Sequence, residues 1–193
     1  MASALDHRVR IIGGRHRGRI IRFPAAPGLR PTPDRVRETL FNWLGQDLDG
    51  WRTLDLYAGS GAMSLEALSR GAGLAVAVDR NPLLVRAFAE TAKALGATGL
   101  EAHTAEAQAF LARESRVFDV VFLDPPFDSD PWSELLPACA PRLAPGGFLY
   151  AEAPRQLAAP GGFVAWRHAK AGAVHYHLFR NAAAVISCDR AGA

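Results

Sequence analysis

The tetrapeptide Asp124-Pro125-Pro126-Phe127 combines residue types that could grip a flat chemical group bearing an NH2. It directly follows an apolar run, residues 120–123, that is typical of a buried strand. The Asp124 carboxylate and the Pro125 carbonyl can each accept one amine hydrogen, and the Phe127 ring can stack on a base. Because proline has no N–H and a fixed φ, the loop offers carbonyl oxygens without competing donors. Taken alone, Asp-Pro after a strand is more often an ordinary turn.

A second motif, Leu54 to Gly61, predicts a strand that runs into a Gly-x-Gly turn and then a helix. Glycines let the backbone approach a ligand closely, and the N–H groups of the following helix point outward at that place. Asp79 comes 18 residues after Gly61, at the end of another apolar run. An acid at that spacing can accept hydrogen bonds from ribose hydroxyls. A dinucleotide site is the alternative, but the third glycine of a pyrophosphate fingerprint is missing.

Together and in this order, the motifs resemble the S-adenosylmethionine-dependent methyltransferases that modify exocyclic amines. The blocks 30–42, 58–62 and 66–72 are similar to the bacterial family that methylates guanine N2 in small-subunit ribosomal RNA, the RsmD family. The opening segment, with Arg10-Ile11-Ile12-Gly13-Gly14, fits as well. The resemblance covers roughly residues 8–180, and its most family-specific part is the block that begins Arg30-Pro31-Thr32.

The resemblance implies S-adenosylmethionine as the cofactor, and it carries roles onto matching residues of this chain. The implied catalytic residues are Asp124, Pro125, Pro126 and Phe127, which we call the amine grip because they could hold the substrate amine. The implied cofactor-binding residues are Asp55, Tyr57, Gly59, Ser60, Gly61, Asp79, Arg80, Glu106, Ala107 and Asp124. Glu106 would accept from the adenine amino group, although a first-turn helix glutamate favoured by the helix dipole is an equal alternative. The family usually has the shorter acid at 106 and the longer one at 79, and here the sizes are reversed.

Charge is distributed unevenly along the chain, although the net charge is only +3. Residues 1–37 hold nine arginines and two acidic residues, whereas the remainder is mildly acidic. These arginines alternate with apolar residues, and this pattern predicts a β-hairpin with its turn near residues 13–18. A basic arm of this kind favours binding to RNA phosphates. The alternative is a solvated tail, which is what most runs of charged residues form. The expected RNA contacts are Arg10, Arg15, Arg17, Arg19, Arg22, Arg30, Arg35 and Arg37.

Strand and helix patterns alternate along the rest of the chain. We predict an α/β fold: a Rossmann-like S-adenosylmethionine-dependent methyltransferase with a mostly parallel seven-stranded sheet, helices on both faces, and an N-terminal basic hairpin and helix extension. The extension would span residues 1–45 and the methyltransferase domain residues 46–193, as one compact unit overall. Helices are expected at 32–44, 61–70, 82–95, 106–113 and 131–143, and strands at 53–57, 74–79, 100–104, 118–123, 147–152, 163–168 and 174–180.

Composition excludes several classes of protein. Two cysteines do not make a disulfide scaffold, and no cluster of His, Cys and Asp predicts a metal. His175 and His177 alternate on a strand, which favours surface or sheet roles. No apolar window is long enough for a transmembrane helix, and residues 1–10 lack a signal core. We therefore expect a cytoplasmic protein without membrane association. A monomer is the expected oligomeric state, although none of these features determines it.

The expected reaction is direct displacement: Asp124 and the Pro125 carbonyl hold the amine, whose lone pair turns toward the methyl group. The expected partner is ribosomal RNA, as part of the small subunit or its assembly intermediate, with the target base flipped out or in a loop. Three alternatives stay open: an amino-methyltransferase acting on DNA adenine, a non-catalytic RNA-binding assembly factor, and a dinucleotide-dependent oxidoreductase. A protein glutamine methyltransferase would usually begin the tetrapeptide with asparagine, so Asp124 favours a nucleobase.

Overall fold

The structure, a computed structural model, describes residues 7–27, 29, 32–126 and 131–184. The chain forms two compact units, Met1–Ala107 and Gln108–Ala193. The N-terminal hairpin shares the apolar core of the first unit. Within the described residues, no helix has both the length and the apolar character needed to cross a membrane.

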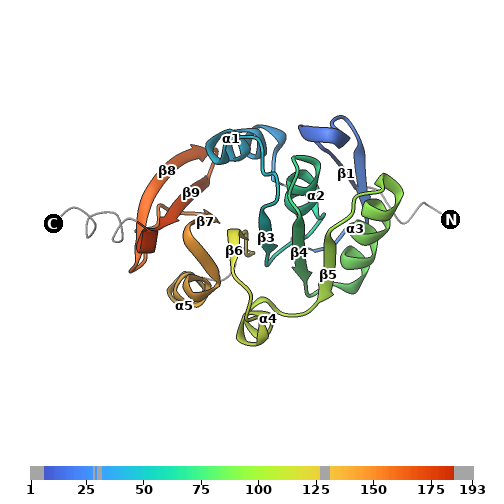
Figure 1. Ribbon diagram of the computed structural model, residues 1–193. Helices are drawn as coiled ribbons and strands as arrows, with labels where there is room; N and C mark the ends of the chain where they lie inside the picture. The colour runs from blue at the N-terminus through green and yellow to red at the C-terminus, as the bar shows by residue number, and fades with distance from the viewer. Residues whose placement is uncertain (1–6, 28, 30–31, 127–130, 185–193) are drawn as a thin grey trace. The chain divides into compact units, whose positions relative to one another are not determined.

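The N-terminal hairpin has the predicted form. β1 (His7–Arg10) and β2 (Ile20–Phe23) pair antiparallel with Val9 opposite Ile21, and a short 3-10 turn, η1 (Gly14–His16), lies between them. Val9, Ile21 and Phe23 are buried, while the neighbouring arginines point outward. The buried side joins one cluster with Phe88 of α3 (Pro82–Leu95), beside which the hairpin lies in Figure 1. Burial of these apolar side chains anchors the arginine-bearing arm.

The first unit also holds a parallel sheet in the order β5-β4-β3. Its strands are β3 (Arg52–Asp55), β4 (Leu74–Asp79) and β5 (Leu100–Thr104). Helix α1 (Asp34–Leu44) ends at Gly45, whose φ of +101° reverses the chain. Helix α2 (Ala62–Ser69) is buried along its whole length, so its polar residues require internal partners.

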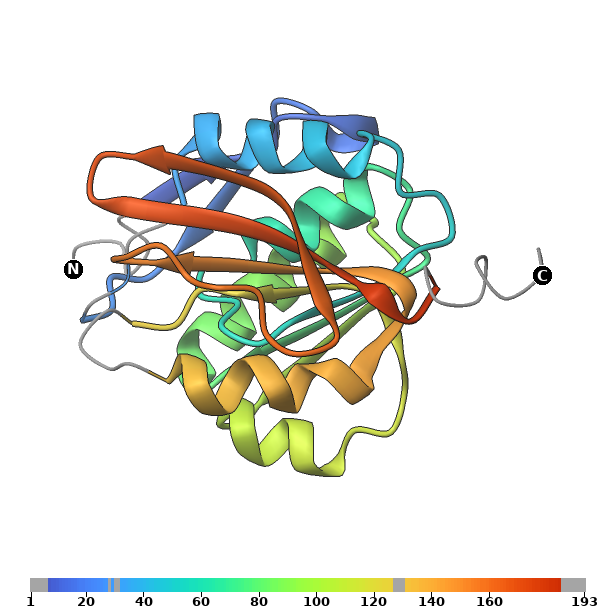
Figure 2. The same cartoon turned by 90° about the vertical axis from the view of Figure 1, so that its left-hand side faces the viewer.

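Helix α4 (Ala107–Arg113) begins at the last residue of the first unit. The second unit contains the rest of α4, α5 (Trp132–Cys139), the short turns η2 (Ala140–Arg142) and η3 (Ala182–Ala184), and four strands. The strands, in the order β6-β7-β9-β8, are β6 (Phe118–Leu123), β7 (Leu143–Ala153), β8 (Phe163–Ala171) and β9 (Val174–Asn181). β6 and β7 are parallel, and β9 is antiparallel to both its neighbours. β8 and β9 form the long orange and red hairpin of Figure 2.

The predicted α/β class with mostly parallel strands is confirmed. The bounds of β4, β5, β6 and α3 agree with the prediction, and most other elements differ by one to three residues at an end. The largest differences lie around α5, which ends at Cys139 rather than near residue 143, and β7, which begins at Leu143 rather than 147. Pro137 within the helix and Pro141 in η2 shorten α5, because proline cannot donate to the preceding turn.

Candidate functional site

Three predicted cofactor acids follow the carboxyl ends of adjacent parallel strands in the first unit. Asp55 is the last residue of β3, Asp79 is the last of β4, and Glu106 comes shortly after β5 ends at Thr104. In the strand register, Asp79 lies opposite Thr104. Ligands of such sheets bind at the carboxyl ends of the strands. One edge of this sheet therefore carries all three acids.

The glycine turn between β3 and α2 adopts a conformation that favours glycine. Gly59 has a φ of +52° and Gly61 a φ of +74°. A Cβ atom at Gly61 would lie 2.4 Å from the Cβ of Phe88, so a larger residue has no room there. Beside the turn, Tyr57 is half-buried and Ser60 is buried, and Arg80 further along is exposed. The turn thus brings its backbone close to α3 at Phe88.

Asp79 ties the glycine turn to its own strand end. Its carboxylate accepts hydrogen bonds of 2.8 Å from the backbone N–H groups of Gly59 and Asn81. The backbone carbonyl of Asp79 also accepts from the N–H of Ala105, in the loop that carries Glu106 and leads to Ala107. A carboxylate offers about four acceptor positions, so capacity remains for hydroxyl donors from a ligand. A ribose contact for Asp79 stays a prediction.

Asp55 is a buried acid beneath the turn. Its Oδ2 accepts a hydrogen bond of 3.1 Å from the Ser64 hydroxyl, and only 3% of the residue is exposed. Burial raises the pKa of Asp55 to about 7, and donation from Ser64 and the Tyr57 backbone opposes this rise. The Asp55 carboxyl can therefore gain or lose its proton near neutral pH, whereas an exposed aspartate with an ordinary pKa stays ionised there.

The predicted amine grip belongs to the second unit. Asp124 directly follows β6 and is half-buried, Pro125 is buried, and Pro126 is exposed. Phe127 lies outside the described residues, so its stacking role stays a prediction. Pro125 has no N–H, and its carbonyl therefore comes without a competing donor at that residue. The position matches the expected placement of the acid at a strand end.

A buried pair on the neighbouring strand was not foreseen. The Tyr150 hydroxyl donates a hydrogen bond of 2.7 Å to Oε1 of Glu152, and both residues lie in β7. Leu123 is opposite Ala151 in the parallel register, so Asp124 and Glu152 follow on adjacent strands. Burial, then the Glu152 interaction and, more weakly, the Asp124 charge raise the pKa of Tyr150 well above its ordinary value. Tyr150 thereby stays protonated and orients Glu152, a residue whose type alone predicted no role.

The basic arm is held to α2 by one buried acid, Glu66. Its two oxygens accept from the backbone N–H groups of Ile12 (2.8 Å) and Gly13 (2.7 Å). Arg70 also donates to it, at 2.8 Å from Nε. Ser69 supports the same contact, because its hydroxyl donates to the Gly13 carbonyl at 2.6 Å. A glutamate on the apolar side of a helix, four residues before an arginine, is the sequence signal that could have revealed this anchor.

The expectation that Arg37 contacts RNA is wrong, because its side chain is fully buried. Its Nη2 donates to Oδ1 of Asp34 at 2.6 Å and to the Arg10 carbonyl at 2.7 Å. Its Nε donates to the Thr32 carbonyl, and Nη1 lies 3.4 Å from Oε2 of Glu66. Arg37 therefore joins α1, β1 and α2 and cannot reach a phosphate.

The other predicted RNA contacts that the structure describes are exposed: Arg10, Arg15, Arg17, Arg19, Arg22 and Arg35. Arg30 lies outside the described residues. Arg10 forms an ion pair of 2.9 Å with Asp34. Across residues 7–27, 29, 32–126 and 131–184, no carboxylate forms an ion pair with the remaining five, so their charge faces solvent.

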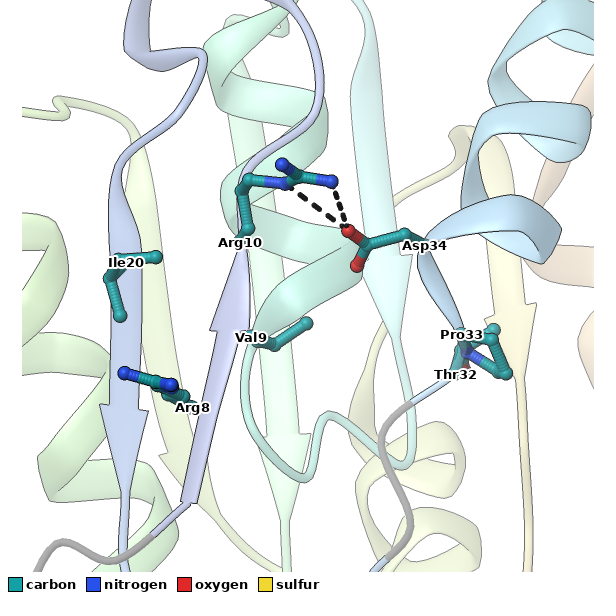
Figure 3. Close-up of a pocket in the computed structure, with 7 residues that line it drawn as sticks. All are labelled: Arg8, Val9, Arg10, Ile20, Thr32, Pro33 and Asp34. Atoms are coloured by element: carbon teal, nitrogen blue, oxygen red, sulfur yellow. Dashed lines mark hydrogen bonds and ion pairs between the residues drawn. The ribbon is translucent and has the colours of Figure 1, made fainter.

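A groove of about 380 Å³ opens between the hairpin and the start of α1 (Figure 3). Arg8 and Arg10 lie on either side of Val9 along β1, and the Arg10–Asp34 ion pair lies at one end of the group of lining residues (Figure 3). Its lining residues are Arg8, Val9, Arg10, Ile20, Thr32, Pro33 and Asp34. Arg8, which was not among the predicted RNA contacts, adds to the charge here. The groove combines cationic and apolar groups of the kind that nucleotides contact.

Three histidines meet on the β8–β9 hairpin, although no such cluster was expected. The ring nitrogens of His168, His175 and His177 lie within 4.8 Å of one another. His177 uses both nitrogens: Nε2 accepts from Leu157 N–H at 3.0 Å, and Nδ1 lies 3.3 Å from the Ala151 carbonyl. In this cluster, that leaves His168 and His175 as possible metal ligands. Nε2 of His168 lies 3.1 Å from Nδ1 of His175. This geometry fits a hydrogen-bonded pair on a strand surface.

Comparison with known proteins places the chain among RNA-modifying enzymes. A family model described as Conserved hypothetical protein 95 matches residues 9–180. The Escherichia coli K12 protein named Ribosomal RNA small subunit methyltransferase D is 37% identical over 180 residues, which cover 91% of each chain.

Comparison with solved structures also finds methyltransferases. One titled Putative methyltransferase yhhF from Escherichia coli superposes with a TM-score of 0.84 at 34% identity and covers 92% of this chain and 99% of its own. A Thermus thermophilus structure, titled 16S rRNA N2 G1207 methyltransferase (RsmC) in complex with AdoMet and Guanosine, has a TM-score of 0.69 at 24% identity. It covers 91% of this chain and 49% of its own, and at this identity it supports the fold alone.

Proposed function

The chain belongs to the family of the Ribosomal RNA small subunit methyltransferase D proteins, and on this premise we propose that it methylates the exocyclic N2 amine of a guanine in small-subunit ribosomal RNA. The coarser activity, methylation of ribosomal RNA, follows from family membership. The base, the atom and the residues are our proposal. We further propose that the protein acts as a monomer on the small subunit or on its assembly intermediate.

The cofactor positions proposed in the first unit fit S-adenosylmethionine in their chemistry. Asp79 and Glu106 can accept from hydroxyl and amino groups, and positive φ values at Gly59 and Gly61 bring backbone N–H groups to the sheet edge. Asp55, whose pKa of about 7 permits ionisation at neutral pH, suits a cationic methionine amino group nearby. When bound, the cofactor supplies a methyl group made electrophilic by its sulfonium.

Asp124 would activate the substrate amine. An exocyclic amine is a weak nucleophile because its lone pair is delocalised into the ring. The Asp124 carboxylate and the Pro125 carbonyl would each accept one N–H, which orients the lone pair away from the ring plane. The carboxylate also stabilises the positive charge that develops on nitrogen. Correct orientation of two reactants lowers a barrier by about 7–11 kcal/mol in favourable cases. The nitrogen–carbon bond would form as the bond between that carbon and the sulfonium sulfur breaks. The methylated ammonium would then release one N–H proton to water, so no strong base is required.

Glu152 and Tyr150 would support the same site from β7. Because Tyr150 donates to Glu152 and stays protonated, the Glu152 carboxylate is held in one orientation one strand away from Asp124. A fixed negative charge beside Asp124 favours cationic character in the reacting amine. We therefore assign Glu152 a positioning role rather than contact with the base.

The observation that carries this proposal is Asp124 followed by Pro125 at the end of a parallel strand in a chain of this family. The test is transfer of a labelled methyl group to small subunits from cells that lack the activity, with mapping of the modified nucleotide. We expect label on one guanine N2. Label on DNA adenine, or no label despite cofactor binding, would contradict the proposal.

A further inference from the structure

Trp166 occupies a bulge in β8, the last strand in the order β6-β7-β9-β8. Ala165 pairs with Phe179 and Arg167 pairs with Leu178, so Trp166 is the extra residue between two consecutive partners. A bulge turns a side chain away from the regular alternation of its strand. The Trp166 side chain is correspondingly among the large apolar groups that stay exposed, at 37%.

Two guanidinium groups and a second ring surround this indole. The Arg167 and Arg180 guanidinium carbons lie 5.0 and 5.1 Å from the centre of the Trp166 ring. The Phe148 ring lies 6.4 Å away at an angle of 55°, with Arg180 also above it at 6.0 Å. We call these four residues the Trp166 platform. They come from three strands, β7, β8 and β9, so the sheet itself positions them.

The arginines of the platform remain available to an anion. The hydrogen bonds found for them go to backbone carbonyls, from Arg167 to Trp166 at 2.9 Å and from Arg180 to Gly146 at 3.4 Å. In the part of the chain that the structure describes, neither forms an ion pair with a carboxylate. Each guanidinium therefore keeps N–H donors that can turn toward a phosphate.

The β8–β9 hairpin carries a net positive charge. Residues 163–181 contain Arg167, Lys170 and Arg180 but no acidic residue, whereas the chain after residue 37 is acidic on balance. The hairpin turns one broad face toward the viewer in Figure 2. An exposed aromatic ring within a positive surface is the arrangement with which proteins hold unpaired nucleotides: the base stacks, and the cations contact the backbone.

We propose that the Trp166 platform binds an unpaired nucleotide of the ribosomal RNA substrate, with the base stacked on Trp166 and the flanking phosphates held by Arg167 and Arg180. The inference deepens the proposed function, on which it rests. The substrate would then offer a second single-stranded nucleotide, separate from the base that is methylated, and a basic surface of the second unit would bind it.

The test compares three variants of the full chain with wild type. Binding of a fluorescent single-stranded fragment of small-subunit ribosomal RNA is measured, together with methyl transfer at varied RNA concentration. We expect Trp166→Ala to weaken binding and raise KM about tenfold, because one base loses its stacking partner, while kcat at saturating RNA stays unchanged. Trp166→Phe should recover most of the affinity. Val164→Ala, at an exposed position of the same strand, should change neither quantity.

Charge provides an independent measurement that does not depend on the Trp166 variants folding. Arg167→Gln and Arg180→Gln should each make the dependence of log Kd on log salt shallower by somewhat less than one unit. Unchanged affinity in Trp166→Ala with unchanged salt dependence in the arginine variants would overturn the proposal. Normal binding of naked RNA with lost activity only on whole subunits would also overturn it, and would assign the platform to a ribosomal protein.

Failure of the proposed function gives a different result. A wild-type protein that transfers no methyl group to RNA, yet binds RNA through Trp166, would refute the guanine-methylation proposal and leave the platform standing.

Discussion

One oxygen of the Glu66 carboxylate accepts a hydrogen bond of 2.7 Å from the backbone N–H of Gly13, a residue 53 positions earlier in the chain. The same carboxylate faces the buried guanidinium of Arg37 and accepts from Arg70. The arginine-bearing hairpin is thus attached to α2 through a fully buried charge. Attachment of this kind gives the exposed arginines a defined geometry, which a disordered basic tail lacks.

We predict that Glu66→Gln destabilises the protein by about 3–5 kcal/mol, because it removes the buried negative charge that pairs with Arg70 and that, together with Asp34, neutralises Arg37. Urea unfolding measures the change. The control is Glu90→Gln, which removes an acid from the exposed ion pair with Arg86 and should change the free energy of unfolding far less, because solvent screens that pair. Equal effects in the two variants would contradict the anchoring role of Glu66.

Asp55 should make stability depend on pH in an unusual direction. Its pKa is about 7 in the folded protein and near its ordinary value of 3.8 when unfolded, so the folded state binds the extra proton between these values. Stability is therefore expected to fall as pH rises from about 4 to about 7, by up to about 1.4 kcal/mol per pH unit from this group. Thermal unfolding of the cofactor-free protein at several pH values measures this fall in stability. Asp55→Asn should remove the part of the fall that comes from residue 55. A pH profile that the substitution leaves unaltered would show that Asp55 does not titrate in this range.

Asp124→Asn should lower kcat by at least about 100-fold, because the amide presents hydrogens where the substrate amine needs an acceptor. Cofactor affinity, measured by calorimetry, should stay close to wild type. Asp119→Asn alters an acid on the same strand and serves as the control, with kcat expected to be unchanged. Near-normal turnover in Asp124→Asn would remove Asp124 from the mechanism.

The exposed arm arginines should set the salt dependence of RNA binding. Replacing Arg15, Arg17 and Arg19 together with glutamine is expected to make the slope of log Kd against log salt shallower by about 2 units. Arg86→Gln removes an exposed but ion-paired arginine and should leave the slope unchanged. Truncation of residues 1–22 is a poorer test, because it also removes buried Val9, Ile11 and Ile21. If the triple variant keeps the wild-type slope, the arm does not contact phosphates.

The order of elements and the identity of the chemical groups were predictable from the sequence. Apolar runs ending in Asp55, Asp79 and Asp124 predicted strands whose ends carry acids, because strand periodicity and turn chemistry are local properties. The Gly-x-Gly turn was predictable for the same reason, since its φ values depend on residue type. The proposed roles of Asp79, Glu106 and Phe127 toward cofactor and base are still untested.

Tertiary structure decided which charges face solvent and which are buried. Arg37 and Arg35 stand two positions apart in one arginine-rich block, yet Arg37 is buried against Glu66 while Arg35 is exposed. Likewise, the sequence around Trp166 is that of an ordinary strand, and only the fold shows the bulge at Trp166 and the position of Arg180 beside its ring. Burial and pairing depend on residues far apart in sequence, so local patterns determine which chemistry the chain carries, and only the packed fold determines where each group can act.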